Sequence, residues 1–163
     1  MEKERLHFCI GRFDHYYDSV NSKSNVQLGL GIFVTGGLIS LYPWMDQTVE
    51  CTMFVHMLLG AEILLGLGVV LLTLMATTPY LSSPQQSPYF FGSIADITEK
   101  QFARRSLRMT NDEESEDLRS QVYALAKGLK SKFQKLRIVS WLLIVQFLLI
   151  VPLIIIAFIN LKK

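Results

Sequence analysis

The chain has 163 residues, of which 50% are hydrophobic and only 18% are charged, and its formal net charge is +2. A soluble domain usually has about a quarter of its residues charged, so this composition favours a membrane protein. The small net charge gives no basis for binding a nucleic-acid polymer through bulk electrostatics. The two cysteines, Cys9 and Cys51, form neither a disulfide framework nor a metal-ligand spacing.

Residues 1–25 are predicted to form an amphipathic helix. Their apolar side chains recur at spacings of three and four, which places them on one helical face. These residues are Leu6, Ile10, Phe13, Tyr17 and Val20. Charges run throughout the segment and it has no apolar core, so we do not interpret it as a signal peptide.

Residues 26–75 are predicted to form a transmembrane helical hairpin. The first apolar run, 26–45, carries no charge, and the second, 53–75, carries one, Glu62. About 20 apolar residues are enough for a helix to cross a bilayer. Small residues four apart, Gly31 with Thr35 and Gly36 with Ser40, are suited to close helix contacts.

Glu62 is the main polar candidate within the membrane, because an ionisable group inside a span is costly to bury. Two interpretations remain open: a carboxylate that lines or gates a pathway, or a protonated carboxyl that bonds across helices for assembly. Gln146, near the middle of the third run, is a plausible partner for Glu62. His56, near the outer third of the second run, is the other candidate for a pathway or assembly role.

Residues 76–137 are predicted to be a second polar region, beginning with a proline-rich irregular connector over 76–92. Its sequence "SPYFFGS" carries three adjacent aromatic residues, Tyr89, Phe90 and Phe91, followed by Gly92. Two roles remain open for these rings. They plug a small helical bundle, with Gly92 making the turn, or at least one of them stacks on a flat base.

Two capping boxes predict helix starts in this region: Thr98 with Gln101, and Thr110 with Glu113. The first predicts a helix through about residue 107. After the second, apolar residues recur at spacings of three and four, which predicts an apolar stripe with the lysines off it. The stripe consists of Leu118, Val122, Leu125, Leu129, Phe133 and Leu136.

The third apolar run, 138–160, carries no charge, and the last predicted segment is 138–163. No helix breaker separates it from the preceding stripe, so we expect one helix from about residue 112 to residue 160. The predicted fold is therefore an all-α polytopic membrane protein. It has three transmembrane helices, a small helical cytoplasmic module, and a long last helix that continues into the membrane.

Lysine and arginine counts predict the orientation. Residues 1–25 hold four and residues 76–137 hold ten, whereas the loop 46–52 holds none. The positive-inside rule then places the N-terminus and the middle segment in the cytoplasm.

Catalysis is poorly supported, because the histidines show no metal-binding spacing and the chain has no phosphate-binding glycine loop. We expect no enzymatic activity, no metal and no cofactor. A binding role has two cationic candidates: Lys23 with Asn21 and Asn25 at the mouth of the first span, and a basic patch containing Arg104 and Arg105. The alternatives are a polar membrane-boundary collar for the first, and a solvated face or a contact with lipid headgroups for the second.

Three segments in order resemble the Pycsar membrane effectors. They are "SVNSKSNVQLGLGIFVTGGLIS" at 19–40, "PYFFGSIADITEKQF" at 88–102 and "QVYALAKGLKSKFQKLRIVSWLL" at 121–143. One departure is Asn21, at a position where many relatives carry an acid.

The resemblance implies an anti-phage effector of the bacterial inner membrane. A partner pyrimidine cyclase makes cyclic CMP or cyclic UMP on infection, the cytoplasmic part senses it, and the spans then disrupt the membrane in an abortive infection. A homo-oligomer is expected, because three spans do not enclose a pore. The residues expected at the ligand are Asn21, Lys23, Asn25, Tyr89, Phe91, Arg104, Arg105 and Lys127. The alternatives are a membrane anchor that binds a partner protein and a small ion-channel subunit.

Overall fold

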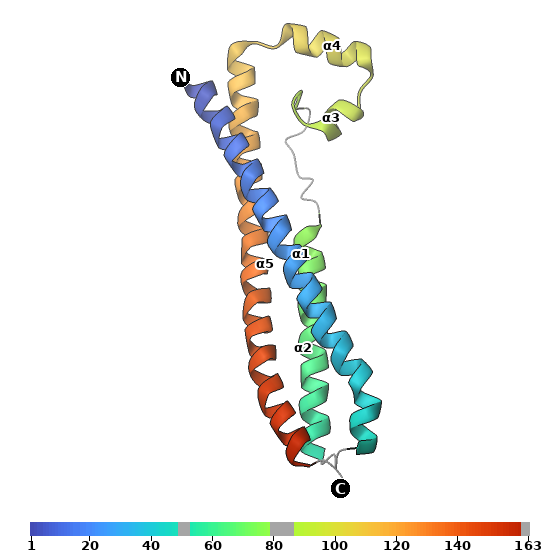
Figure 1. Ribbon diagram of the computed structural model, residues 1–163. Helices are drawn as coiled ribbons and strands as arrows, with labels where there is room; N and C mark the ends of the chain where they lie inside the picture. The colour runs from blue at the N-terminus through green and yellow to red at the C-terminus, as the bar shows by residue number, and fades with distance from the viewer. Residues whose placement is uncertain (49–52, 79–86, 161–163) are drawn as a thin grey trace. The chain divides into compact units, whose positions relative to one another are not determined.

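The computed structural model describes residues 1–48, 53–78 and 87–160. Its elements are α1 (Glu2–Thr48), α2 (Met53–Thr77), α3 (Phe91–Ala95), α4 (Glu99–Arg108) and α5 (Asn111–Ile159) (Figure 1). All elements of the described chain are helices. Three of them, α1, α2 and α5, are long and apolar enough to cross a membrane. The predicted class, an all-α polytopic membrane protein with a long last helix, is confirmed.

Helix α1 joins two segments that the sequence pattern distinguishes. It runs for 47 residues without a break, through both the charged N-terminal segment and the first apolar run. The change from polar to apolar composition near residue 25 contains no proline, and helix formation does not require constant polarity. Pro43 lies inside the last turns of α1.

Helices α4 and α5 begin where local capping chemistry places them. The Thr98 hydroxyl accepts from the Gln101 backbone N–H, and the Gln101 side chain accepts from the Thr98 backbone N–H at 2.9 Å. Thr110 and Glu113 repeat this reciprocal pair, with the Thr110 N–H donating to Glu113 Oε2 at 2.8 Å. Both predicted capping boxes are confirmed.

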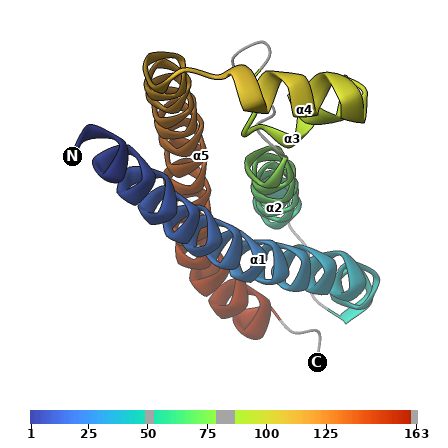
Figure 2. The same ribbon diagram turned by 90° about the horizontal axis from the view of Figure 1, so that it is seen from above.

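The chain divides into two compact units. The polar unit comprises residues 1–19 and the described residues of 79–131, and so includes the start of α1, α3, α4 and the start of α5. Figure 2 shows α4 and the short connection that leads from it into the start of α5. The membrane unit comprises residues 20–78 and 132–160 and is a bundle of three helices.

The membrane unit is held together along heptad-spaced seams. On α2 the buried positions alternate by four and three residues, the spacing of left-handed helix packing. These positions are Val55, Leu59, Glu62, Gly66, Val69, Thr73 and Ala76. Two apolar clusters lie on the seam, one around Leu59 with Met45 and Leu153, and one around Val69 with Val139.

The apolar stripe predicted on the last long helix is correct except at residues 132 and 133. Leu118, Leu129 and Leu136 are buried, but Phe133 is exposed and Lys132 is buried. Lys132 Nζ donates to the Thr77 carbonyl at 3.5 Å. Cations next to the last turn of a helix satisfy its free carbonyls. The burial of Lys132 is therefore explained by its hydrogen bond to the end of α2, which the spacing of apolar residues does not predict.

Some sequence-based expectations fall on residues outside the described part of the chain. These are Cys51, most of the short hairpin loop, and residues 79–86 of the proline-rich connector. Asp46, which the sequence placed in the hairpin loop, belongs instead to the last turn of α1.

Candidate functional site

The membrane unit encloses a polar cluster to which each of its three helices contributes one side chain: Thr35 from α1, Glu62 from α2 and Gln146 from α5. Glu62 and Gln146 are completely buried, and Thr35 is 4% exposed. Gln146 Nε2 donates to the Glu62 backbone carbonyl at 3.4 Å. The structure thus brings Gln146 to Glu62, the pair proposed from sequence, and adds Thr35, which the sequence analysis did not single out as polar.

The cluster is rich in acceptors and poor in donors. Four of its oxygens have no hydrogen-bond partner within the described residues: Thr35 Oγ1, both carboxyl oxygens of Glu62 and Gln146 Oε1. An ionised carboxylate without a partner is very costly in an apolar medium. A proton on the carboxyl group, or a bound cation, would supply the missing partner. In either case, a rearrangement that admits water would change the ionisation or the ligand of the Glu62 carboxyl group.

Gly66 allows the three helices to meet at this cluster. A Cβ atom at position 66 would lie 1.8 Å from Thr35 Oγ1 and 2.8 Å from Gln146 Nε2, so no other residue fits without displacing both. Gly31 makes a similar approach to α2, where a Cβ would lie 2.7 Å from Val69 Cγ1. Of the two small-residue pairs predicted for helix contacts, Gly31 with Thr35 is buried, whereas Gly36 and Ser40 are exposed.

His56 lies apart from the cluster. Its Nε2 is 3.4 Å from Asp46 Oδ1, and its ring meets the edge of Tyr42 at a centroid distance of 6.2 Å. Six residues of helix separate it from Glu62, about 9 Å along the axis. The structure therefore places His56 in a contact between α1 and α2, away from the polar cluster.

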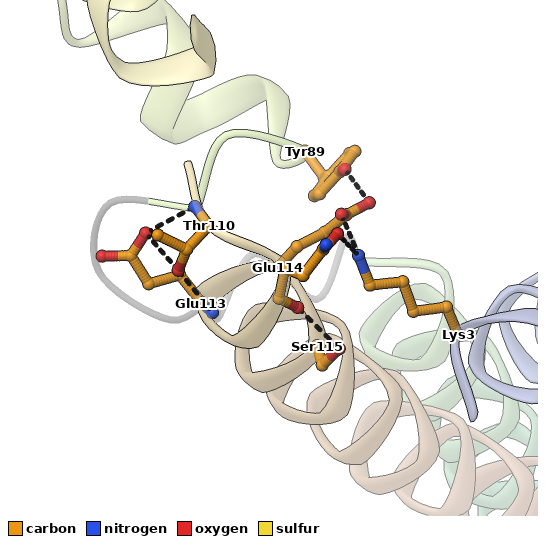
Figure 3. Close-up of polar contacts among 7 residues, drawn as sticks. Lys3, Tyr89, Thr110, Glu113, Glu114 and Ser115 are labelled. Carbon is orange, nitrogen blue, oxygen red and sulfur yellow. Dashed lines mark hydrogen bonds and ion pairs between the residues drawn. The ribbon is translucent and has the colours of Figure 1, made fainter. Parts of the chain in front are cut away.

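The polar unit contains a second polar arrangement, centred on Glu114 of α5 (Figure 3). Its carboxylate accepts from Lys3 Nζ of α1 on one oxygen and from the Tyr89 hydroxyl, at 2.8 Å, on the other. Lys3 Nζ also donates to Asn111 Oδ1 at 2.7 Å. We call Lys3, Tyr89, Asn111 and Glu114 the Glu114 node; it ties the start of α1 and the aromatic connector to α5.

Two further contacts support the node. The Arg119 guanidinium donates to both carboxylate oxygens of Glu2, at 2.8 and 2.9 Å. The buried Ser87 hydroxyl donates to Asp117 Oδ2 at 2.8 Å. The connector and the α1 terminus are thus attached to the same stretch of α5 by charge-assisted hydrogen bonds, which are stronger than neutral ones.

The node shifts two pKa values in opposite directions. The hydrogen bond from Lys3, followed by that from Tyr89, lowers the pKa of Glu114. The hydrogen bond that the Tyr89 hydroxyl donates to Glu114 raises the pKa of Tyr89, and partial burial adds to this.

The three aromatic residues do not form the plug that was one of the two predicted roles. Tyr89 is 47% exposed and Phe91 is 67% exposed, and only Phe90 is half-buried, with its ring 4.8 Å from that of Phe91. Gly92 lies within α3 and does not form a turn. The plug prediction fails for Tyr89 because its hydroxyl donates to the half-buried carboxylate of Glu114, which holds the ring at the surface.

The other predicted ligand residues fall into both units. Arg104 and Arg105 lie on α4 and Lys127 on α5, all in the polar unit together with Tyr89 and Phe91. Arg104 and Lys127 are exposed, and Arg105 is half-buried. The remaining three residues, Asn21, Lys23 and Asn25, are exposed on the part of α1 that belongs to the membrane unit.

The described residues contain no group of three or more side chains suited to hold a metal ion. Sequence reasoning missed Lys3 and Glu114, because their pairing joins positions 111 residues apart. It also missed the heptad spacing on α2, although that signal was present: Glu62 and Gly66 both fall in the four-three alternation of apolar residues.

The fold and the two polar arrangements define a class: a polytopic, all-α membrane protein with an intramembrane polar cluster and a compact polar helical unit. The model of the Pycsar effector protein domain matches residues 5–159, nearly the whole chain and both units. The chain belongs to the Pycsar effector family and is an anti-phage defence effector. No curated protein and no solved structure matches it.

Replacing Gly66 with alanine tests the helix contact at the cluster. We expect Gly66→Ala to destabilise the membrane unit by about 1–3 kcal/mol, the usual cost of overpacking, and to lower the melting temperature of the purified protein in detergent. The matched control is Gly60→Ala on the same helix, where a Cβ meets nothing within 4 Å. This control should be neutral or stabilising, because alanine favours helix. Equal melting temperatures for the two variants would refute the contact.

The Glu114 node predicts a pH dependence of the polar unit. The folded-state pKa of Glu114 is lowered, so its stabilisation is present above the unfolded pKa and is lost as pH falls through the lowered value. The pKa of Tyr89 is raised, so its stabilisation is present below the unfolded pKa and is lost as pH rises through the raised value.

Hydrogen exchange of the backbone amides of residues 87–95, corrected for intrinsic pH effects, measures both the acid and the alkaline loss of stability. In Glu114→Gln both pH-dependent losses should become smaller. In the control Glu116→Gln, at an exposed position of the same helix, both should remain as in the wild type. A pH profile unchanged by Glu114→Gln would contradict the assignment.

Proposed function

We propose that this effector senses cyclic CMP or cyclic UMP through its polar unit and, once the nucleotide is bound, disrupts the bacterial inner membrane through its membrane unit. The family match supports the defence role. The observation that carries the membrane step is the polar cluster of Thr35, Glu62 and Gln146, completed by all three helices at mid-span. The proposed mechanism is non-enzymatic and requires no cofactor.

The orientation follows the distribution of cations. The polar unit and the N-terminus lie in the cytoplasm, where the nucleotide is made by a partner cyclase, and the connection between α1 and α2 faces outward. This assignment rests on the excess of lysine and arginine in residues 1–25 and 76–137 over the loop 46–52.

The polar unit offers the groups that a cyclic pyrimidine mononucleotide needs. Tyr89 and Phe91 present exposed rings on which a base can stack. Arg104, Arg105 and Lys127 supply cations for the single phosphate charge. A nucleotide phosphate that competes with Glu114 for Lys3 would break the Lys3–Glu114 ion pair, and so would couple ligand binding to the attachment of α1 to α5.

The membrane step requires that the ligand favour a second arrangement of α1 and α5. A ligand shifts such an equilibrium only by the difference in its affinity for the two states. Opening the contact at Gly66 would expose the unpartnered oxygens of Glu62 and Gln146 to water, which hydrates them. Three helices do not enclose a pore, so conduction requires several copies. The exposed Gly36–Ser40 pair permits close approach by a helix of another copy.

The buried carboxyl group of Glu62 also favours one alternative, a small ion-channel subunit with a constitutive pathway. The two functions differ in whether leakage depends on the nucleotide. The other alternative, a membrane anchor for a partner protein, predicts no leakage at all.

Leakage from liposomes tests the proposal directly. The full-length chain is reconstituted into vesicles that trap a self-quenched dye, and cyclic CMP, cyclic UMP or cyclic AMP is added. We expect a pyrimidine nucleotide to release dye and cyclic AMP to have little effect. Leakage without any nucleotide would support the channel alternative, and absence of leakage in every condition would support the anchor.

Glu62→Gln in the same assay tests the cluster. An amide provides N–H donors for the unpartnered oxygens and so stabilises the closed cluster. We expect nucleotide-dependent leakage to fall at least about fivefold, the effect of roughly 1 kcal/mol. Glu116→Gln, an exposed carboxyl group in the polar unit, is the matched control. Leakage unchanged by Glu62→Gln at equal protein level would refute the role of the cluster.

Binding of labelled nucleotide to the detergent-solubilised protein tests the stacking role of Tyr89. Losing one stacked base costs about 1–3 kcal/mol, so Tyr89→Leu should weaken binding at least about fivefold while Tyr89→Phe retains most of it. Tyr123→Leu, an exposed tyrosine of α5 outside the aromatic connector, should bind normally. If Tyr89→Leu binds like the wild type, the base lies elsewhere, even if leakage still depends on the nucleotide.

A further inference from the structure

The membrane unit has a hollow between α1 and α5 that the proposed function does not use. Its volume is about 570 Å³, and α1 contributes Lys23 and Gln27 while α5 contributes Phe133 and Arg137. We call it the Lys23–Arg137 pocket. Its lining combines cations and polar groups with apolar side chains, and it includes no aspartate or glutamate.

The two cations of the pocket are free to bind an anion. Within the described chain, neither the Lys23 nor the Arg137 side chain forms a hydrogen bond or an ion pair. Lys3 and Arg119 of the polar unit, in contrast, each bind a carboxylate. A guanidinium and an ammonium that line one hollow form a site for a phosphate group.

Gln27 sets a second requirement for the ligand of the pocket, in addition to the negative charge that Lys23 and Arg137 require. Its Nε2 donates to Ser140 Oγ at 2.7 Å, and Ser140 Oγ in turn donates to the Leu136 carbonyl at 3.0 Å. This chain fixes the amide and leaves Gln27 Oε1 buried without a donor in the described residues. The ligand that completes the pocket therefore carries an anionic phosphate and, close to it, a hydroxyl or ammonium donor.

The position of the pocket along the helices matches the level of lipid headgroups. Lys23 lies just before the first apolar run, which begins at residue 26, and Arg137 lies just before the third, which begins at residue 138. Cations at the ends of spans contact anionic headgroups. Val26, which begins the first apolar run and is exposed, forms an apolar wall on the membrane side of the pocket, suited to the glycerol and acyl region.

We propose that the Lys23–Arg137 pocket binds the phosphodiester of an anionic phospholipid headgroup of the phosphatidylglycerol type. The phosphate lies between Lys23 and Arg137, and a headgroup hydroxyl donates to Gln27 Oε1. A cyclic nucleotide is also a phosphodiester with hydroxyl groups, so the experiment must separate the two sources.

Trp141 reports on the pocket because it lies one helical turn beyond Arg137 and is 59% exposed. The chain has two tryptophans, and the other, Trp44, lies near the end of α1 away from the pocket. In a full-length Trp44→Phe protein, quenching of Trp141 by brominated phosphatidylglycerol is compared with quenching by brominated phosphatidylcholine. Both are measured in vesicles of unbrominated phosphatidylcholine.

We expect brominated phosphatidylglycerol to be preferred at least about fivefold, as one or two cation contacts predict. Arg137→Gln should reduce the preference about fivefold, and Arg137→Lys should retain most of it. Lys130→Gln, an equal charge change at an exposed position of α5, is the matched control and should have no effect. Circular dichroism confirms that the variants keep their helix content.

Three outcomes would overturn the proposal. The first is equal quenching by the two lipids in the wild type, and the second is an equal loss of preference in Arg137→Gln and Lys130→Gln, which indicates surface charge alone. The third is loss of labelled cyclic CMP or cyclic UMP binding in Arg137→Gln, which assigns the pocket to the soluble phosphodiester. A lipid preference lost in Arg137→Gln but not in Lys130→Gln, with nucleotide binding retained in Arg137→Gln, supports the lipid site.

Discussion

The structure of the membrane unit depends on one constraint: a carboxyl group lies inside an apolar medium and must be enclosed by protein. Glu62 meets this constraint only because α1 and α5 both reach α2 at the same level, and they do so because position 66 has no side chain. The apolar clusters on either side of this level stabilise the bundle, but any three apolar helices can form such clusters. The polar cluster fixes which faces meet, since any other register leaves the carboxyl group in lipid.

In the polar unit, electrostatics takes the place of a large apolar core. The Glu114 node and the Glu2–Arg119 pair attach the start of α1 to α5 through exposed or half-exposed groups. Such pairs are individually weak and are screened by salt. An attachment of this kind can be displaced by another anion, and the proposed sensing of a cyclic nucleotide depends on such a displacement.

Most of the fold could be predicted from the sequence because its determinants are local. Three apolar runs long enough to cross a bilayer and two capping boxes each carry their signal within a few turns of helix. The partner of Glu62 was identified in Gln146 for a similar reason, since both are isolated polar residues in apolar runs. Thr35 was not identified as a member of the polar cluster. Threonine is common in transmembrane helices, and only the structure shows that this one faces Glu62 and Gln146.

The remaining differences arise where a helix changes neighbours. Helix α5 passes from the polar unit to the membrane unit at residues 131–132, and a single stripe drawn along it cannot describe both sides. This is why Lys132 is buried and Phe133 exposed. The role of Tyr89 depended on a carboxylate 25 residues away, and no local pattern specifies such a pairing.

The lysines that bind the end of α2 have a consequence for how the protein is made. The Met75 carbonyl accepts from Lys135 Nζ at 3.1 Å, and the Thr77 carbonyl accepts from Lys132. Synthesis proceeds from the N-terminus, so α1 and α2 leave the ribosome more than 50 residues before these lysines do. Until then the end of α2 lacks these donors and Glu62 lacks Gln146. The hairpin is therefore an incomplete intermediate during insertion, and the arrival of α5 both completes its polar contacts and commits the chain to its final topology.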